Sequence, residues 1–367
     1  MKIGINATFL NEKPTGIGVF TREISRALFK LHQEIIFFSP VPHTGIPSTC
    51  THIVPGMMKG SSRLSNNLCR IAYTNTALPI QCKLRKIDVL YCPITEFPFL
   101  PAVPLVVHVQ DLHPVHFPSQ FGLAASRLRL SLKMMNKVAK RVIVSSEFVR
   151  GELMGLTNIR DALIDVIPLA CSKDVFKPMP LEMKKAFLDK YFLSGNYILF
   201  IGTLFPYKNL KTLIDAFVSI KSQIPHSLVV VGRKDFSAAP LARDGRIVYL
   251  DYVPAEDLPF FYSYADVFVY PTLREGFGIS PLEAMACGAP VISSNGGSLP
   301  EVIGNAGILF DPQDSGALST SILKVVQDER LRRELVDKGF NHVKKFSWRT
   351  TAERIILSCE KAATEKG

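Results

Sequence analysis

The chain has 367 residues, about twice the usual size of one domain, so two domains are expected. Hydrophobic residues make up 47% and charged residues 20%, a balance typical of folded globular proteins. No apolar run approaches the roughly 20 residues of a membrane-spanning helix. The first residues turn polar too early for a secretory signal, so we expect a soluble chain that stays where it is made. The seven cysteines are scattered without zinc-ligand spacing, which indicates reduced thiols in a cytoplasmic compartment.

The net charge of +11 is concentrated in one half of the chain. Residues 1–172 carry 19 lysines and arginines against 10 aspartates and glutamates, a net +9, whereas the remainder carries 24 against 22, a net +2. This asymmetry indicates an anionic partner for the first half: a membrane surface, a nucleic acid or an acidic substrate. A basic protein without any such partner is the alternative.

Short apolar runs rich in valine and isoleucine alternate with helical patterns along the whole chain. Runs such as 103–109 and 228–231 are apolar on both faces, which is typical of parallel strands buried between helices. Because the alternation occurs twice, it predicts an α/β fold of two doubly wound, Rossmann-like domains. The predicted strands are 2–6, 35–39, 87–92, 103–109, 141–145, 164–167, 197–202, 227–232, 246–250, 265–270, 289–293 and 307–310.

The pattern is interrupted once, at residues 171–195, where polar residues and prolines replace the apolar runs. We therefore expect an N-terminal domain over 1–172 and a linker over 173–195 that contains a short helix at 181–192. A C-terminal domain follows over 196–346. The last residues, 347–367, are predicted to form a helix that packs back on the N-terminal domain.

The most informative segment is the loop between strand 265–270 and the following helix. Gly276 and Gly278 allow the backbone to approach a ligand, and the helix start offers free N–H groups to an anion. Glu275 stands at the loop entrance, and we expect that removing this loop carboxylate abolishes activity and leaves the fold intact. Amides for phosphate beside a carboxylate for hydroxyls suit a sugar nucleotide. An ordinary turn with a solvated charge is the alternative.

Helix signals follow directly after this loop. Ser280 is predicted to cap the helix N-terminus, Pro281 to occupy its first turn and Glu283 to complete a capping box. Gly288 is predicted to end the helix after about two turns. On these signals alone, Glu283 is a capping residue.

Two further strand-to-helix turns carry glycine or lysine. The first contains Gly16 and Gly18 but no third glycine, which disfavours a dinucleotide-binding site. The second, at residues 201–210, delivers Lys208 to a helix start, where a lysine can neutralise a phosphate leaving group. Surface lysines are also common at helix starts, so this position alone is weak evidence.

Together these motifs resemble the family 4 glycosyltransferases of the GT-B fold. The resemblance rests on the E-x7-E spacing of Glu275 and Glu283 and on segments along the whole chain: 15–18, 145–148, 202–210, 281–288, 298–302 and 346–348. It implies two Rossmann-like domains facing each other across a cleft. It also implies a retaining, metal-independent transferase that needs no cofactor, with the donor nucleotide held mostly by the second domain.

The resemblance also implies roles for individual residues. Glu283 would hold the ribose hydroxyls, Lys208 the diphosphate, and Glu275 the donor sugar. The catalytic candidates are Glu275, Gln110 and Asp111. The nucleotide-sugar-binding candidates are Gly16, Gly18, Thr203, Lys208, Val253 (near the base), Glu275, Gly276, Phe277, Gly278, Ile279 and Glu283.

Two positions depart from the family pattern. Tyr207 stands where an arginine is usual, which removes one phosphate-binding cation. Gln110 stands where a histidine is usual; the amide can hydrogen-bond a sugar hydroxyl but cannot titrate. His108 and His113 flank this position, and nothing in the sequence transfers the histidine's role to either.

Basic residues cluster in the N-terminal domain. Three stretches stand out: 57–63, 83–86 and one with Arg127, Arg129, Lys133, Lys137, Lys140 and Arg141, in which Arg129, Lys133 and Lys137 lie on a different helical face from the apolar residues. They would suit anionic headgroups or the diphosphate of a lipid-linked glycan. A core helix with a solvated basic face is equally compatible with the last stretch.

The sequence thus predicts a cytoplasmic hexosyltransferase at the inner face of the cell membrane. It would move mannose from GDP-mannose to a lipid-linked glycan acceptor in cell-surface polysaccharide assembly. The alternatives are a transferase using a UDP-sugar or another nucleotide sugar, a sugar-nucleotide epimerase or hydrolase of the same fold, and a basic nucleic-acid-binding protein. The last lacks a recognisable reader motif, so no nucleic-acid partner is expected.

Overall fold

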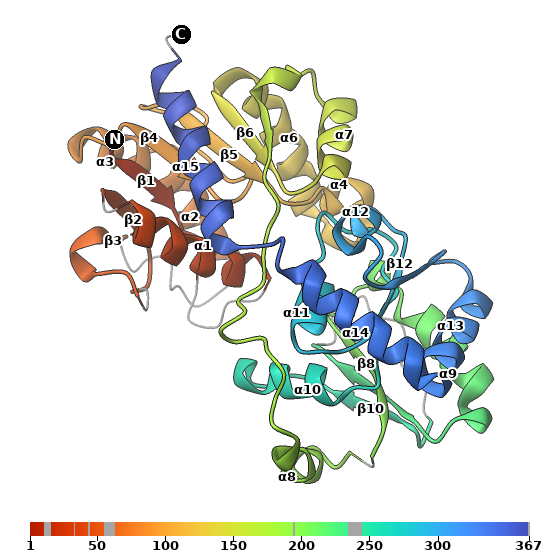
Figure 1. The fold of residues 1–367 in the computed structure, drawn as a ribbon. Helices are drawn as coiled ribbons and strands as arrows, with labels where there is room; N and C mark the ends of the chain where they lie inside the picture. Colours follow the sequence, from red (N-terminus) through yellow and green to blue (C-terminus); the bar gives the residue numbers. More distant parts are fainter. Residues whose placement is uncertain are drawn as a thin grey trace. The chain divides into compact units, whose positions relative to one another are not determined.

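Two parallel sheets organise the chain in the computed structural model, which describes residues 1–10, 16–32, 34–42, 45–54, 63–193, 195–233 and 244–365. Each sheet forms the centre of one compact unit (Figure 1). The first unit comprises Met1–Leu169 together with Trp348–Gly367, and the second comprises Ala170–Ser347.

The first unit contains seven parallel strands in the order β3-β2-β1-β4-β5-β6-β7. Strands β1, β4, β5 and β6 are buried along their whole length, which explains why their sequences are apolar on both faces. The strands are β1 (Ile3–Asn6), β2 (Ile35–Ser39), β3 (Thr51–Ile53), β4 (Val89–Cys92), β5 (Leu105–Val109), β6 (Arg141–Val144) and β7 (Ile164–Val166).

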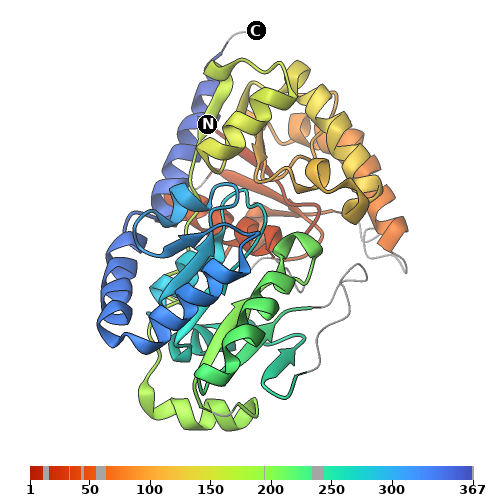
Figure 2. The same cartoon turned by 90° about the vertical axis from the view of Figure 1, so that its right-hand side faces the viewer.

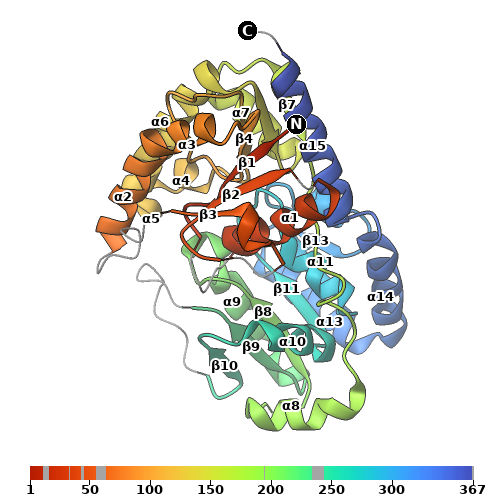
Figure 3. The ribbon, with the colours of Figure 1, turned by 90° about the vertical axis from the view of Figure 1, so that its left-hand side faces the viewer.

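Helices cover both faces of this sheet (Figure 3). Apolar side chains of α3, α6 and α7 form a buried cluster with one face, and α15 contacts β4, β5 and β6 and pairs with α1. The helices are α1 (Ile17–Leu31), α2 (Arg63–Asn75), α3 (Ala77–Leu84), α4 (His113–His116), α5 (Pro118–Phe121), α6 (Leu123–Val138), α7 (Glu147–Leu156) and α15 (Trp348–Thr364), with 3-10 turns η1 (Ser48–Cys50) and η3 (Asp161–Leu163).

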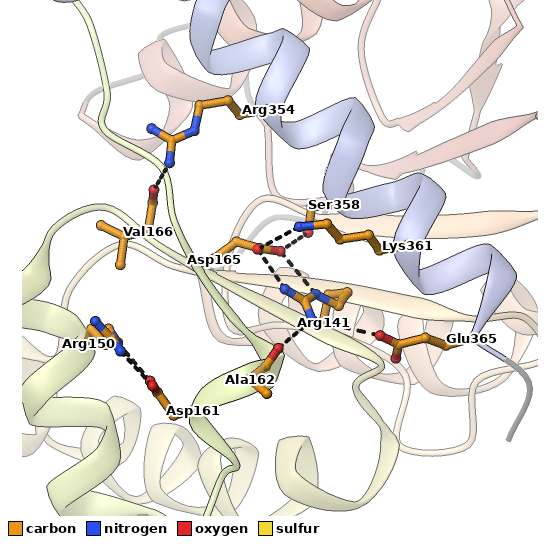
Figure 4. A network of polar contacts seen from close by, with 10 residues as sticks. All are labelled: Arg141, Arg150, Asp161, Ala162, Asp165, Val166, Arg354, Ser358, Lys361 and Glu365. Carbon is orange, nitrogen blue, oxygen red and sulfur yellow. Dashed lines mark hydrogen bonds and ion pairs between the residues drawn. The ribbon is translucent and has the colours of Figure 1, made fainter.

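The predicted C-terminal helix is confirmed as α15, and a polar network holds it on the first unit (Figure 4). Arg141 donates two hydrogen bonds to Asp165, at 3.0 and 2.6 Å. From α15, Ser358 donates to the same carboxylate at 2.8 Å, and Lys361 lies 3.5 Å from it. Arg141, the last residue of the basic stretch noted in the sequence, is buried and paired, so it does not belong to an exposed basic surface.

The second unit contains six parallel strands in the order β10-β9-β8-β11-β12-β13. Both sheets therefore share the doubly wound order in which the chain runs outward to one side of the first strand and then to the other. The strands are β8 (Tyr197–Ile201), β9 (Ser227–Val231), β10 (Ile247–Leu250), β11 (Val267–Tyr270), β12 (Val291–Ser294) and β13 (Ile308–Phe310).

Helices also cover both faces of the second sheet (Figures 1 and 2). The buried core on one face joins α9 and α13 to side chains such as Ile198 and Phe200. On the other face, the Tyr197 hydroxyl donates to the Phe261 carbonyl of α10 at 2.8 Å. The helices are α8 (Lys184–Lys190), α9 (Leu210–Ile220), α10 (Leu258–Tyr264), α11 (Ile279–Ala286), α12 (Leu299–Ile303), α13 (Ser315–Gln327) and α14 (Glu329–Val343), with 3-10 turns η4 (Leu181–Met183), η5 (Pro206–Lys208), η6 (Lys221–Gln223) and η7 (Ala255–Asp257).

Residues 173–195, expected as a linker, belong to the second unit. Their helix α8 packs on α10, where the Phe187 ring lies 4.8 Å from the Phe261 ring. The Lys190 ammonium and the Tyr191 hydroxyl both bind the Asp257 carboxylate, at 2.7 and 2.5 Å. This segment is therefore packed against the second unit's own helices along much of its length.

The two-sheet α/β architecture and each predicted strand are confirmed, with strand ends within two residues of the predicted ones. The additional strand β3 was missed because it lies at the sheet edge, is only partly buried, and therefore lacks an apolar run. Within the described ranges, no helix combines the length and hydrophobicity needed to cross a membrane.

Candidate active site

The candidate donor site lies at the carboxyl ends of β8 and β11, the two strands between which the chain order of the second sheet reverses. In doubly wound sheets, ligands bind outside the carboxyl ends of the strands at this switch point. The segment after β8 carries Thr203, which is exposed, and ends in the η5 turn with Lys208. The segment after β11 carries Glu275 and leads into α11.

Lys208, Tyr270 and Glu275 form a buried cluster at this point. The Lys208 Nζ lies 2.6 Å from Glu275 Oε1 and 2.9 Å from the Tyr270 hydroxyl, which itself donates to Glu275 Oε1 at 3.0 Å. The side chains of Lys208 and Glu275 are 11% and 9% exposed. Burial, followed by the Glu275 charge, holds the pKa of Tyr270 well above its usual value, so Tyr270 acts as a hydrogen-bond donor.

Glu275 is buried, which argues against the expectation that its removal costs little stability. A buried carboxylate that neutralises a buried lysine is part of the core of this site, because removing either partner leaves an uncompensated charge. Sequence reasoning missed this because Lys208 and Glu275 are 67 residues apart and meet only when β8 and β11 pair.

A second loop, after β12, supports the backbone that carries Glu275. The Ser298 amide donates to the Glu275 carbonyl at 3.1 Å. A Cβ at Gly297 would lie 2.4 Å from that same carbonyl, and a Cβ at Gly296 would lie 2.5 Å from the Leu273 carbonyl. Only glycines allow this backbone contact. Two adjacent glycines shortly after the predicted strand 289–293 were the sequence signal for this close backbone contact, which the sequence analysis missed.

The helix after the glycine loop begins two residues earlier than predicted. Helix α11 starts at Ile279, and its N-cap is Gly278, in the left-handed region at φ 86° and without a side-chain cap. The predicted capping box of Ser280 and Glu283 is therefore wrong, whereas Gly288 does follow the helix end, at φ 85°. Because no side chain caps this end, its first amides remain candidates for binding an anion.

Glu283 lies on α11 with a different partner from the one predicted. The Tyr262 hydroxyl donates to Glu283 Oε2 at 3.1 Å. Burial raises the pKa of Glu283 to about 7, against the opposite effect of this hydrogen bond. The carboxyl group therefore lies between its neutral and charged forms near neutral pH, so a ligand donating hydroxyls to it would favour the charged form.

The other predicted residues of the second unit lie in the segments that follow β10 and β11. Gly276 is buried, and the Phe277 ring packs edge-on against Phe346 with centroids 5.9 Å apart. Val253, in the segment after β10, is buried as well. Tyr207, in place of the family's arginine, stacks on Phe205, and its carbonyl accepts from the Leu273 amide at 2.8 Å. Its ring therefore packs where the family has a cation.

The first unit contains a cavity of about 180 Å³, here called the first-unit cavity, at the carboxyl ends of β4 and β5. Gln110 and Asp111 both line it, as does Ile17 at the start of α1, directly between Gly16 and Gly18. The Gln110 side-chain amide donates to the Pro93 carbonyl at 2.9 Å. Asp111 Oδ1 binds the backbone and side chain of His113, at 3.1 and 3.0 Å.

His108 forms part of the wall of this cavity as a neutral imidazole. Its Nδ1 pairs with the Tyr91 hydroxyl at 2.9 Å, and its Nε2 lies 3.3 Å from the Ser145 hydroxyl. Burial lowers the pKa of His108 to about 3, so it is uncharged at neutral pH. It is therefore not positioned to replace a titrating histidine at Gln110.

Glu96 also lines the first-unit cavity, and the sequence analysis missed it. Arg70 of α2 donates to both of its carboxylate oxygens, at 2.6 and 3.1 Å, and Arg127 of α6 lies 3.7 Å away. Its position four residues after strand 87–92 could have indicated a site residue, because the loops at the carboxyl ends of parallel strands lie at the same edge of the sheet.

The three predicted basic stretches differ in how far their side chains are exposed and in how much of each stretch the structure describes. Arg129, Lys133 and Lys137 are exposed on α6, as predicted, while Leu128, Leu132 and Met135 are buried on its opposite side. In the stretch 83–86, Arg85 binds the His52 ring at 2.7 Å and Lys83 and Lys86 are exposed. Residues 57–62 of the remaining stretch, and Thr15 of the first glycine turn, lie outside the described residues.

Within the described part of the chain, no three or more histidine, cysteine, aspartate or glutamate side chains gather in a way that could hold a metal ion. The candidate site presents the Lys208 ammonium and the first backbone N–H groups of α11, which are neutral but carry a partial positive charge. Together with Glu275, they provide donors and an acceptor at the switch point of the second sheet.

Part of the chain is similar in sequence to known proteins. Residues 189–342 match the family described as glycosyl transferases group 1. O-antigen chain mannosyltransferase B of Escherichia coli is 39% identical over 228 residues, which cover 59% of this chain and 60% of the relative. O-antigen chain mannosyltransferase RfbU of Salmonella typhimurium is 29% identical over 227 residues, 60% of each chain. The matches thus span about 60% of the length of these relatives.

Solved structures share the fold over nearly the whole chain. HepE of Anabaena, in complex with UDP and glucose, superposes with a TM-score of 0.75 at 20% identity, covering 98% of this chain and 99% of its own. WaaG, a glycosyltransferase involved in lipopolysaccharide biosynthesis, gives 0.73 at 14% identity, covering 97% and 98%. The resemblance to glycosyltransferases that the sequence predicted is confirmed over residues 189–342.

Proposed function

We propose that the chain is a retaining glycosyltransferase that moves mannose from GDP-mannose to a glycan acceptor, because residues 189–342 match the glycosyl transferases group 1 family and the relatives include mannosyltransferases. The observation that carries the proposal is the arrangement at the switch point of the second sheet. There a buried Lys208–Glu275 pair adjoins the uncapped start of α11. The choice of mannose rests on the mannosyltransferase relatives.

The donor would be held by charge and hydrogen bonding from the second unit. The amides at the start of α11 and the Lys208 ammonium would stabilise the negative charge that develops on the departing diphosphate. Glu275 and the amides of residues 276–279 would bind hydroxyls of the donor sugar, and Glu283 those of the ribose. Thr203 and Val253 would border the nucleotide. Because the protein itself supplies these charges, transfer is expected to continue in EDTA.

The acceptor side is assigned to the first unit, where Gln110 and Asp111 line the first-unit cavity. Gly16 and Gly18 flank Ile17, which also borders this cavity, and they stay candidates for binding the nucleotide sugar. Gln110 would orient a sugar hydroxyl, since its side-chain amide is already bound to the Pro93 carbonyl and its oxygen can accept.

We further propose that the acceptor is lipid-linked and that the protein binds the inner face of the cell membrane. Helix α6 exposes Arg129, Lys133 and Lys137 together with apolar side chains. Leu123 and Leu130 on this helix are 83% and 49% exposed. Basic and apolar side chains on one exposed helix suit an anionic lipid surface.

A donor panel tests the proposed reaction. The full chain is incubated with GDP-mannose, UDP-glucose, UDP-N-acetylglucosamine or ADP-glucose and a synthetic lipid diphosphate bearing a mannose-terminated oligosaccharide. We expect transfer from GDP-mannose alone, a product whose new bond keeps the donor's anomeric configuration by NMR, and the same rate in EDTA. Transfer from a UDP-sugar would refute the donor assignment. Donor consumption without any glycan product would favour a hydrolase or epimerase.

A further inference from the structure

The first-unit cavity contains a carboxylate, Glu96, whose position is fixed from two directions. The Asn6 side chain, at the end of β1, donates to the Glu96 carbonyl at 3.0 Å. Arg70 holds the carboxylate through two hydrogen bonds, and the side chain is 11% exposed. A carboxylate held in a bidentate arginine pair keeps one orientation, and its remaining lone pairs can still accept hydrogen bonds.

The charges around the cavity indicate an uncharged ligand. Glu96 and Asp111 line the cavity together with Arg127, and Arg70 neutralises Glu96 from α2. Two carboxylates and two arginines therefore balance, so a phosphate would gain no net attraction there. Carboxylate and amide oxygens on a cavity wall are instead acceptors for hydroxyl groups.

The size and the apolar part of the wall narrow the ligand further. At about 180 Å³, the cavity is smaller than the roughly 300–1,000 Å³ of pockets for drug-sized ligands, so it suits a single sugar ring. Ile17, Pro114 and Leu128 supply an apolar surface beside the carboxylates. A sugar ring has both hydroxyl groups and an apolar C–H face.

We propose that this cavity binds the non-reducing terminal monosaccharide of a neutral acceptor glycan and that Glu96 accepts a hydrogen bond from one of its hydroxyls. This inference rests on the proposed function and extends it: Glu96 becomes a specificity-determining residue for the acceptor, positioned by Arg70. Any lipid diphosphate of the acceptor would then bind elsewhere, because the cavity carries no net positive charge.

The test combines two Glu96 variants with single-deoxy acceptors. Glu96→Gln and Glu96→Ala are compared with the wild-type chain on a mannose-terminated oligosaccharide and on analogues lacking one terminal hydroxyl each. We expect one analogue to lose at least tenfold in kcat/KM with the wild type. Glu96→Ala should lose a similar factor on the intact acceptor and show no further loss on that analogue. KM for GDP-mannose and donor hydrolysis without acceptor should stay unchanged, because those depend on the second unit.

Controls separate this inference from folding and from the proposed function. Glu147→Gln alters an exposed carboxylate that pairs with Arg150 on α7, outside the cavity, and should behave as wild type. Thermal melting shows whether each variant is folded. If Glu96→Ala does not fold, Glu96→Gln is used in its place. Acceptor binding without donor is followed by saturation-transfer NMR, so it can be read even if no donor supports transfer. An unchanged acceptor KM and deoxy profile in a folded Glu96 variant would overturn the inference while leaving the transferase proposal intact.

Discussion

The buried Lys208–Glu275 pair predicts a large loss of stability when one partner is removed. Glu275→Ala removes the carboxylate that lies 2.6 Å from the buried Lys208 ammonium. Removing one member of a buried pair costs about 3–5 kcal/mol. For a unit of this size, 1 kcal/mol shifts the melting temperature by about 2–4 °C, so we expect a fall of about 6–20 °C.

The assay is thermal unfolding of the full chain, followed by calorimetry and by tyrosine fluorescence. The double variant Lys208→Met with Glu275→Leu should recover part of the loss, because it leaves no unpaired charge. Asp161→Asn, which breaks an exposed pair with Arg150, is the matched control and should leave the melting temperature unchanged. If Glu275→Ala melted within about 2 °C of the wild type, the argument from the buried pair would be refuted. Loss of activity in a folded Glu275→Gln variant would show that Glu275 contributes to transfer itself and not only to stability.

Three further predictions concern pH and charge. Because burial raises the pKa of Glu283 to about 7 and ribose hydroxyls would favour its charged form, the Kd for GDP should rise as pH falls below 7. Titration calorimetry between pH 5.5 and 8.5 should show this slope in the wild type and not in Glu283→Gln; parallel slopes would exclude Glu283 as the ligand. Burial opposes ionisation of Asp165, but hydrogen bonds from Arg141 and Ser358 outweigh it and lower its pKa. The stability that the ionised Asp165 carboxylate contributes is therefore present above the unfolded-state pKa near 4 and lost as pH falls. Asp165→Asn should therefore reduce the dependence of the first unit's stability on pH in the acid range. An unchanged dependence on pH would contradict the network's role. Finally, vesicles containing phosphatidylglycerol should bind the chain at low salt and release it at high salt. Charge reversal should abolish this binding and reduce transfer to a lipid-linked acceptor more than to the lipid-free glycan; equal binding to neutral vesicles would argue against it. The positions to reverse are Arg129, Lys133 and Lys137.

Local patterns in the sequence were sufficient to predict the fold. Strands buried on both faces must be apolar on both faces, so the two sheets and the final helix α15 could be recognised without any long-range contact. The glycine loop before α11 was also recognisable, because Gly278 adopts a left-handed conformation that favours glycine. The same patterns placed Gln110, Asp111, Lys208 and Glu275 at strand ends.

What those strand-end residues contact was decided by tertiary structure. Lys208 and Glu275 are buried as a pair because β8 and β11 are neighbours in the sheet, a fact that neither loop's sequence contains. In the sequence Arg141 cannot be distinguished from a surface cation. In the fold it donates to Asp165 of β7, which also accepts a hydrogen bond from Ser358 of α15. The charge state and stability contribution of such side chains depend on burial and partners, which arise from pairing of distant segments, whereas backbone conformation depends mainly on neighbours in sequence.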